Sequence, residues 1–394
     1  MYNCFSRIVL STLLLLAGPA ARAGDGLTAD EAAAEAARQL AALRQADAET
    51  NRRVWADRIV VRDTLRMPLL YKVFGTAPAD GRSLYISMHG GGNVQAAVND
   101  QQWHNQIALY APAEGVYVAP RAPFDDWNMW FRPQMDDFFG ALIWAAVCEQ
   151  GVNPDKVYLL GYSAGGDGVW RMAPRMADRW AAASMMAGHP GESSQVNLLH
   201  VPYMIWMGAL DSAYSRNVLA ARRAAVMDSL ARRAPGGYVH ATHILPGKGH
   251  WMDRADTAAI GWMARFRRTE NPRRVVWRQE QVVRPALYWL EADVRTAREG
   301  MRVDATVRDN RVELERCDYP RLTICLNDAL ADLDRPVTVV YRGRTLFCGR
   351  LRRSAATIAR TVRERRDPGL VYCAEVTVDV PQQPDSTAAA GQGD

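Results

Sequence analysis

Apolar and polar positions alternate in two different ways along this chain. Between residues 54 and 270, short apolar runs alternate with longer stretches of helical character. The runs that suit buried strands occupy residues 83–88, 116–119, 157–160, 182–186, 203–207 and 242–245. This alternation predicts an α/β domain, in which helices cover both faces of a mostly parallel sheet. Because ligands bind beyond the carboxyl ends of parallel strands, a functional site is expected where these runs end.

The segments on either side of this domain have other patterns. Residues 24–53 are rich in alanine and contain Thr28-Ala29-Asp30-Glu31, which has the form of a capping box and predicts a helix. Residues 271–380 contain short alternating runs and predict a smaller β-rich domain, with one helix near residues 354–366. Residues 381–394 have no apolar periodicity, and their composition predicts a disordered tail.

Residues 1–23 have the pattern of a signal peptide. Arg7 precedes an apolar run over residues 8–17, and a Gly-Pro pair and a small-residue site ending at Ala23 follow. The run is about half of the ~20 residues that a membrane span requires. We therefore expect export to the periplasm or the extracellular space after cleavage near Ala23, and no membrane span in the mature chain. An uncleaved N-terminal anchor is the alternative.

Composition and charge exclude one class of partner. The formal net charge is +5, from 48 basic and 43 acidic residues, and lysine occurs only at Lys72, Lys156 and Lys248. The positive charge is therefore mostly arginine, and it is scattered among acids. A nucleic-acid-binding protein would carry a basic stripe or a recognition motif, and the sequence has neither. No nucleic-acid partner is expected.

Cysteine usage fits an oxidising compartment. Cys317, Cys325, Cys348 and Cys373 are enough for two disulfides, and the sequence leaves all three pairings open. No Cys-x-x-Cys pair indicates a structural zinc site, so no metal is expected.

The strongest chemical motif follows the apolar run that ends at residue 160. Gly161-Tyr162-Ser163-Ala164-Gly165 has the form Gly-x-Ser-x-Gly, and a stretch compatible with a helix comes directly after it. This is the strand–turn–helix context of a nucleophile elbow, in which a tight turn displays the serine hydroxyl. The sequence therefore predicts Ser163 as a catalytic nucleophile.

A second glycine-rich loop follows the run that ends at residue 88. His89-Gly90-Gly91-Gly92 allows a substrate carbonyl to approach the main chain closely, and backbone N–H groups there can stabilise an oxyanion. We expect one donor from Gly91 or Gly92 and the other from Ala164. His89 is interpreted as a residue that packs the loop.

A serine nucleophile needs a base and an acid that orients it, and in this type of fold the acid precedes the histidine in the chain. His250 lies in a flexible turn after the last predicted strand and is the preferred base. Asp211 follows the preceding strand and is the preferred acid. The other candidates for the base are His200, His240 and His243, and the other acids, Asp253 and Asp256, have the positions of helix-start residues.

Taken together, these motifs resemble those of the α/β-hydrolase superfamily over roughly residues 60–268. The stretch from Gly161 to Gly166 is similar to that of secreted polyhydroxyalkanoate-depolymerase-like and feruloyl-type esterases, and to the prolyl-oligopeptidase group of serine peptidases. The resemblance implies an α/β-hydrolase fold and hydrolysis through an acyl-enzyme, without a cofactor. In depolymerase-like esterases the loop often carries another residue and a Gln where this chain has Gly91-Gly92-Asn93.

The contacts to substrate are predicted from position alone. Trp127, Trp130 and His189 follow strand ends on the expected side of the sheet, where they could line a substrate pocket. The leading hypothesis is an exported serine esterase acting on a small or polymeric ester. The alternatives are a peptidase with the same triad and a catalytically idle protein that binds a polymer or surface. Acyl and alcohol specificity and oligomeric state stay open.

Overall fold

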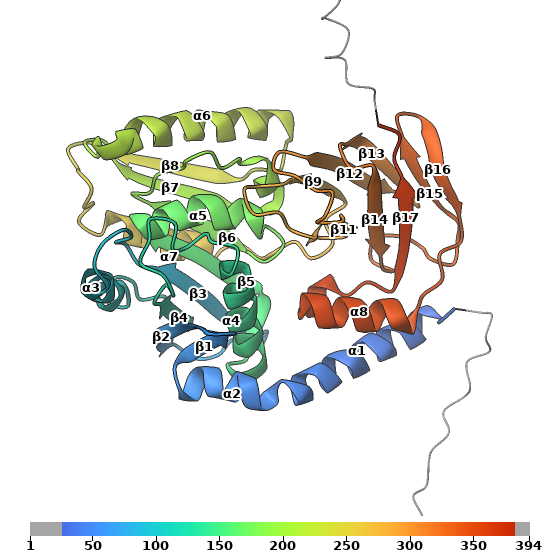
Figure 1. Ribbon diagram of the computed structural model, residues 1–394, viewed down its shortest axis with the longest axis horizontal. Helices are drawn as coiled ribbons and strands as arrows, with labels where there is room; N and C mark the ends of the chain where they lie inside the picture. Colours follow the sequence, from blue (N-terminus) through green and yellow to red (C-terminus); the bar gives the residue numbers. More distant parts are fainter. Residues whose placement is uncertain (1–25, 383–394) are drawn as a thin grey trace, which may run out of the picture.

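The computed structural model describes residues 26–382 of the chain. The predicted signal peptide and all but the first two residues of the predicted tail lie outside this range. An α/β part and a β-rich part lie side by side, and two N-terminal helices run along both of them (Figure 1).

The α/β part is built on one sheet of 8 strands in the order β1-β2-β4-β3-β5-β6-β7-β8. β2 runs antiparallel to both of its neighbours, and all the other pairs are parallel. The strands are β1 (Ile59–Arg62), β2 (Leu65–Phe74), β3 (Arg82–Met88), β4 (Gly115–Pro120), β5 (Val152–Tyr162), β6 (Ala182–Met186), β7 (Tyr203–Gly208) and β8 (His240–Leu245). This confirms the predicted fold class.

Helices cover both faces of the sheet. Alternate residues of a central strand point to opposite faces, and the residues on both faces are buried. Val157 and Leu159 of β5 belong to the larger core beneath α4 and α5, whereas Tyr158 and Leu160 belong to a second core that includes Ile260 of α7. A strand that is buried on both faces has no polar face, which explains why these strands read as apolar runs. The helices are α3 (Ala96–Gln106), α4 (Met135–Glu149), α5 (Ala164–Arg175), α6 (Arg216–Arg233) and α7 (Ala258–Met263). Short 3-10 turns are η1 (Val196–His200), η2 (Ala213–Ser215) and η3 (Ala255–Thr257).

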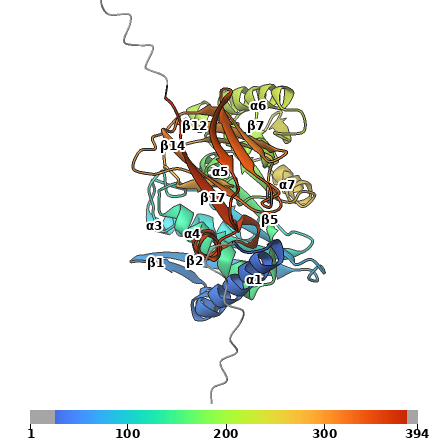
Figure 2. The same ribbon diagram turned by 90° about the vertical axis from the view of Figure 1, so that its right-hand side faces the viewer.

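The β-rich part contains two further sheets, as the alternating pattern beyond residue 271 predicts. One has 4 strands in the order β10-β11-β14-β17, and the other has 5 in the order β16-β15-β13-β12-β9. Figure 2 turns these strands toward the viewer. The strands are β9 (Arg274–Arg278), β10 (Ala286–Leu287), β11 (Leu290–Glu291), β12 (Arg302–Arg308), β13 (Arg311–Cys317), β14 (Arg321–Leu326), β15 (Val337–Tyr341), β16 (Arg344–Gly349) and β17 (Ala374–Asp379). Helix α8 (Ala355–Arg365) and the turn η4 (Pro368–Leu370) precede β17.

The N-terminal helices α1 (Ala29–Ala46) and α2 (Ala48–Ala56) connect the two parts. α1 packs on α8, and α2 packs on α4 and β1. The predicted capping box is present, since Glu31 N–H donates to the Thr28 hydroxyl at 3.2 Å and Thr28 N–H donates to the Glu31 carboxylate at 2.8 Å. The sequence predicts one helix within residues 24–53, whereas the described part of this segment contains two, which meet at Asp47.

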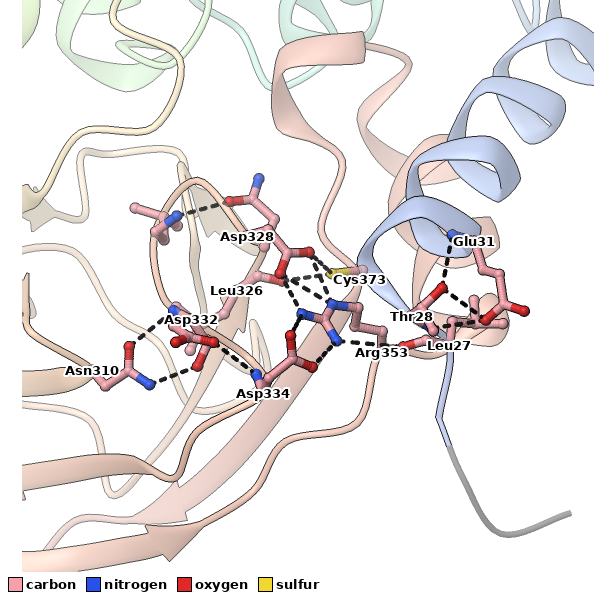
Figure 3. Close-up of polar contacts among 12 residues, drawn as sticks. Leu27, Thr28, Glu31, Asn310, Leu326, Asp328, Asp332, Asp334, Arg353 and Cys373 are labelled. Carbon is pink, nitrogen blue, oxygen red and sulfur yellow. Dashed lines mark hydrogen bonds and ion pairs between the residues drawn. The ribbon is translucent and has the colours of Figure 1, made fainter. Parts of the chain in front are cut away.

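One arginine fastens the start of this helical segment to the β-rich part. Arg353 donates to Asp328 at 2.6 Å and to Asp334 at 2.7 Å, and its backbone oxygen accepts from Leu27 N–H at 3.0 Å (Figure 3). The Arg353 side chain is only 5% exposed, whereas those of Asp328 and Asp334 are 39% and 74% exposed, so the ion pairs lie at the protein surface.

The five cysteines of the described range are all free, so the disulfides that the sequence allows are not formed. Strand register explains part of this result. β14 and β17 pair so that Cys325 lies opposite Glu375 and not opposite Cys373, while Cys348 lies opposite Thr338 in the other sheet.

Candidate active site

The turn between β5 and α5 holds Ser163 in a strained backbone conformation. Its φ is 57° and its ψ is −119°, which non-glycine residues rarely adopt. The turn is tight enough to exclude side chains at its glycines. A Cβ at Gly161 would lie 2.4 Å from the Gly165 oxygen, and one at Gly165 would lie 2.1 Å from the Met88 oxygen. The Gly-x-Ser-x-Gly pattern is thus required by packing.

Ser163, His250 and Asp211 form a continuous hydrogen-bonded chain. His250 Nε2 lies 2.9 Å from Ser163 Oγ, and His250 Nδ1 lies 2.7 Å from Asp211 Oδ2. The His250 side chain is 43% exposed, whereas that of Asp211 is only 2% exposed. The structure therefore brings the three predicted residues together, with the buried acid on the far side of an accessible imidazole. A neutral imidazole in this position donates from Nδ1 to Asp211 and accepts the serine proton at Nε2.

Two residues that the sequence analysis missed support this chain. The Tyr162 hydroxyl donates to the His250 backbone oxygen at 2.7 Å and accepts from Met252 N–H at 3.2 Å, which fixes the loop that carries the imidazole. The Arg216 guanidinium lies 3.4 Å from Asp211 Oδ1, the oxygen that His250 does not use. Tyr162 occupies a variable position of the elbow motif and Arg216 follows Asp211 by five residues, so no motif marks the contacts that they make.

The loop from His89 to Gly92 lies against the nucleophile elbow, as predicted. A Cβ at Gly90 would be 3.2 Å from Ser163 Cβ, and one at Gly92 would be 3.4 Å from Ala164 Cβ. Ala164 is the first residue of α5, so its N–H has no acceptor within the helix. Gly91 has a φ of 102°, and within residues 26–382 its N–H donates to no protein acceptor.

Gly92 differs from Gly91 because its N–H is already engaged. It donates to Asn99 Oδ1 at 2.9 Å. Asn99 Nδ2 in turn donates to Asp125 Oδ1 at 2.7 Å, and Arg121 donates to the same carboxylate oxygen at 2.6 Å. Of Gly91 and Gly92, Gly91 is therefore the residue whose N–H stays free of protein acceptors within residues 26–382, and Asn99 holds the loop.

His89 is fully buried inside this loop, in agreement with a packing role. Its Nδ1 lies 2.6 Å from the Gly90 oxygen, and its Nε2 accepts from Ala122 N–H at 3.2 Å. Burial lowers the pKa of His89 to about 4, so the ring is neutral near pH 7.

The predicted role of Trp130 as a substrate contact is wrong. Its side chain is fully buried, and its indole N–H donates to the His89 backbone oxygen at 2.8 Å. Trp130 therefore packs against the buried side of the loop from His89 to Gly92. Trp127 differs because it is 57% exposed. Its Cα would lie 3.5 Å from a Cβ added at Gly92, so Trp127 is close to the glycine loop.

His189 lies next to the elbow helix. Ser163 N–H donates to the Met186 oxygen at 2.9 Å, which places the loop after β6 beside the nucleophile. His189 N–H donates to Asp167 Oδ1 at 2.6 Å, and burial raises the pKa of that carboxyl group. His189 is thus in a position from which a contact to substrate is possible.

The other candidates for base and acid have different partners. His200 bonds the Arg274 oxygen, His240 bonds Asp228, and His243 stacks on Trp206. Asp253 pairs with Lys248 at 2.6 Å, while Asp256 is buried against the Tyr110 hydroxyl. Asp256 therefore serves the core rather than only the start of a helix.

No group of three or more His, Cys, Asp or Glu side chains in residues 26–382 has the arrangement of a metal site. Over the same residues, no helix combines the length and apolar character that crossing a membrane requires.

The strand order 1-2-4-3-5-6-7-8, with one antiparallel strand and a serine on the turn after β5, defines the α/β-hydrolase fold. No protein-family profile matches the chain, and no curated protein matches its sequence.

Solved structures with a similar arrangement include a thermostable esterase, with 17% identity and a TM-score of 0.39 over 54% of this chain and 64% of that chain. They also include esterase PE8, with 19% identity and a TM-score of 0.34 over 50% of this chain and 97% of that one. Est1E from Butyrivibrio proteoclasticus has 15% identity and a TM-score of 0.32 over 52% and 95% of the two chains. The assignment of the fold stands on the strand order and the elbow of this chain itself.

Proposed function

We propose that the protein is an exported serine hydrolase that cleaves carboxylic esters through an acyl-enzyme on Ser163. The observation that carries the proposal is the hydrogen-bonded chain from Ser163 through His250 to Asp211, displayed at a strained elbow. Strained backbone conformations cost free energy and are concentrated at functional sites, so the strain at Ser163 indicates a functional role for this serine. The signal-peptide pattern of residues 1–23 supports export.

In this mechanism, His250 Nε2 takes the proton from Ser163 Oγ as the oxygen attacks the ester carbonyl. The Ala164 and Gly91 N–H groups then stabilise the oxyanion of the tetrahedral intermediate. When the intermediate collapses, the carbon–oxygen bond to the alcohol breaks and His250 returns the proton to the leaving oxygen. A water molecule activated by His250 attacks the acyl-enzyme in the same way, which releases the acid and restores Ser163.

Exposed apolar side chains that adjoin the triad residues in the sequence, or lie by the glycine loop, support an ester with apolar groups as the substrate. Leu210 precedes Asp211 and is 64% exposed, Trp251 follows His250 and is 49% exposed, and Trp127 lies by the oxyanion loop. A cluster of apolar side chains on a protein surface is typical of a binding site.

The test is labelling of the mature protein with a fluorophosphonate probe, followed by assays with p-nitrophenyl esters and aminoacyl amides. Ser163→Ala should abolish labelling and reduce kcat by a factor on the order of 10⁴ to 10⁶, with an unchanged melting temperature. Labelling that persists at another serine would rule out the assignment. Turnover of amides in preference to esters would identify a peptidase instead.

A further inference from the structure

The loop after β6 brings the elbow helix into contact with a group of arginines. Gly188 packs so closely on α5 that a Cβ there would lie 2.3 Å from the Gly166 carbonyl carbon. His189 follows and binds Asp167, and Arg171 donates to the His189 oxygen at 3.3 Å. Asp167 and Arg171 are spaced four residues apart on α5, so they lie along one face of the helix that begins directly after Ser163.

Arg223 approaches the same loop from α6. Its guanidinium donates to the Gly191 oxygen at 2.8 Å and to Gln195 Oε1 at 3.3 Å. Arg171 donates only to the backbone oxygens of Asp167 and His189, and its guanidinium lies 4.1 Å from the centre of the Phe131 ring.

Neither guanidinium has a carboxylate partner within 4.0 Å among residues 26–382. Arg171 and Arg223 are half-buried, whereas each fully buried arginine of the same range has such a partner, as Arg175 does with Asp136 at 2.6 Å. Arg171 and Arg223 therefore keep a positive charge that backbone oxygens solvate but do not neutralise.

The acids near these arginines have other hydrogen-bond or ion-pair partners, as Asp167 does with His189 N–H. Asp211 is held by His250 and Arg216. Glu280 accepts from Ser194 N–H at 3.2 Å and lies 3.4 Å from Arg278, and burial raises its pKa to about 6. Asp167 has a raised pKa for the same reason. The acids of this region are therefore held by groups other than the guanidiniums of Arg171 and Arg223, whose donors no carboxylate in residues 26–382 occupies.

The same arginines act on the His189 ring. Its pKa is lowered by burial and then by Arg171, Arg216 and Arg223, with no acid acting in the opposite direction. His189 Nδ1 accepts from Gly191 N–H at 3.0 Å, so the neutral ring carries its proton on Nε2 and can donate it.

We propose that Arg171, Arg223 and His189 form a subsite for an anionic group of the substrate, most simply a carboxylate a few atoms away from the ester that Ser163 attacks. This inference rests on the proposed function and names its substrate class. Arg171 lies eight residues, or roughly 12 Å along the helix axis, beyond Ser163. Because long side chains on a helix point back toward its N-terminus, the guanidinium is directed toward the nucleophile.

The experiment compares two p-nitrophenyl esters of equal length, the half-ester of adipate and the same compound with its free carboxylate methylated. The wild-type protein should show a higher kcat/KM for the anionic ester. Arg223→Gln should reduce that preference about tenfold, as the loss of one charged hydrogen bond predicts, and should leave the methylated ester within about twofold. Arg223→Lys should retain part of the preference. Arg222→Gln is the matched control, because Arg222 is the exposed neighbour on α6.

A second measurement does not depend on turnover. Monomethyl adipate should bind the Ser163→Ala protein in calorimetry, and the additional change Arg223→Gln should weaken that binding about tenfold. Repeating the kinetics with the carboxylate on the alcohol side shows which half of the ester the subsite serves.

The inference is overturned if neutral and anionic esters are cleaved equally well, or if Arg222→Gln and Arg223→Gln have the same effect. Absence of labelling at Ser163, together with calorimetric binding that depends on Arg223, would reject the proposed hydrolase function and retain the anionic subsite. If neither the labelling at Ser163 nor the Arg223-dependent binding is observed, both the hydrolase function and the anionic subsite are rejected.

Discussion

Asp211 has a different partner on each carboxylate oxygen. His250 Nδ1 lies at 2.7 Å from Oδ2, and Arg216 lies at 3.4 Å from Oδ1. An asparagine at this position can present an N–H₂ group to the imidazole, which favours the wrong tautomer. Asp211→Asn should therefore reduce kcat/KM by about 10⁴, the size of the effect that the equivalent change has in trypsin.

Asp253→Asn is the control for this substitution. Asp253 is three residues from His250, but its carboxylate pairs with Lys248 at the surface, so the variant should keep activity within a few-fold. Thermal melts of both variants exclude unfolding as the cause. If the Asp211→Asn protein is active and the folded Asp253→Asn protein is inactive, Asp253 and not Asp211 is the acid that orients His250.

His89 should make stability depend on pH because it is buried in its neutral form. Its pKa is about 4 in the folded chain, against about 6.5 for an unperturbed histidine. As pH falls from 6.5 to 4, the unfolded chain binds a proton that the folded chain does not, so stability falls, by up to about 3 kcal/mol. Urea unfolding at pH 7 and pH 4.5 should show a smaller loss for His89→Gln than for the wild type. His104→Gln, which changes an exposed histidine of α3, should behave as the wild type does.

At the residue scale, chemistry was predictable where it depends on local sequence. Ser163 stands in a motif that the turn itself requires, and Asp211 and His250 follow strand ends in the expected order. Asn99 and Arg216 are close in sequence to their partners Gly92 and Asp211, but their contacts depend on the path of the intervening loop, which no motif specifies. The prediction for Trp130 was wrong because position after a strand does not determine whether an aromatic ring faces the solvent or the core.

Helix α5 lies so close to β6 that a glycine is required between them. A Cβ at Gly166 would lie 2.5 Å from the Met186 oxygen and 2.9 Å from Gly188 Cα. Gly166→Ala should therefore push α5 away from β6, which costs about 1–3 kcal/mol of stability and displaces Ser163 as well. Both the free energy of unfolding and kcat should fall.

Gly261→Ala provides the comparison within the same domain. Gly261 lies in α7, and a Cβ added there would meet no atom within 4 Å, so alanine should add about 0.5–1 kcal/mol by favouring the helix. Equal stability changes in the two variants would show that close packing at Gly166 is not the reason for its glycine.

At the element scale, the six predicted strands lie within β3 to β8, because strands buried on both faces read as continuous apolar runs. The β1–β2 hairpin was not predicted. β2 mixes buried Met67 and Leu69 with exposed positions such as Lys72, so it does not show the continuous apolar run of the central strands. β10 and β11 have 2 residues each, too few for a pattern to show.

At the scale of the whole molecule, a buried ion cluster joins the α/β part to the β-rich part. Asp367 precedes η4, and its carboxylate accepts from Arg268 at 2.6 Å and from Arg179 at 3.1 Å. Arg268 also binds Asp155 of β5 at 2.7 Å. Burial alone would raise the pKa of Asp367, but the Arg268 guanidinium holds it below its usual value. Because the cluster is shared, the two parts should unfold together.

Asp367→Asn tests this coupling. The side chains of Arg268 and Asp367 are 1% and 2% exposed, so removing the negative charge leaves two guanidiniums buried without full compensation. Breaking such a pair typically costs about 3–5 kcal/mol. Calorimetry of the wild type should show one cooperative transition, and Asp367→Asn should lower its midpoint or divide it into two. Asp309→Asn is the control, because Asp309 is an exposed residue of the same part, and its φ of 48° suits asparagine as well as aspartate. Two separate transitions in the wild type, or equal melting of both variants, would show that the cluster does not couple the parts.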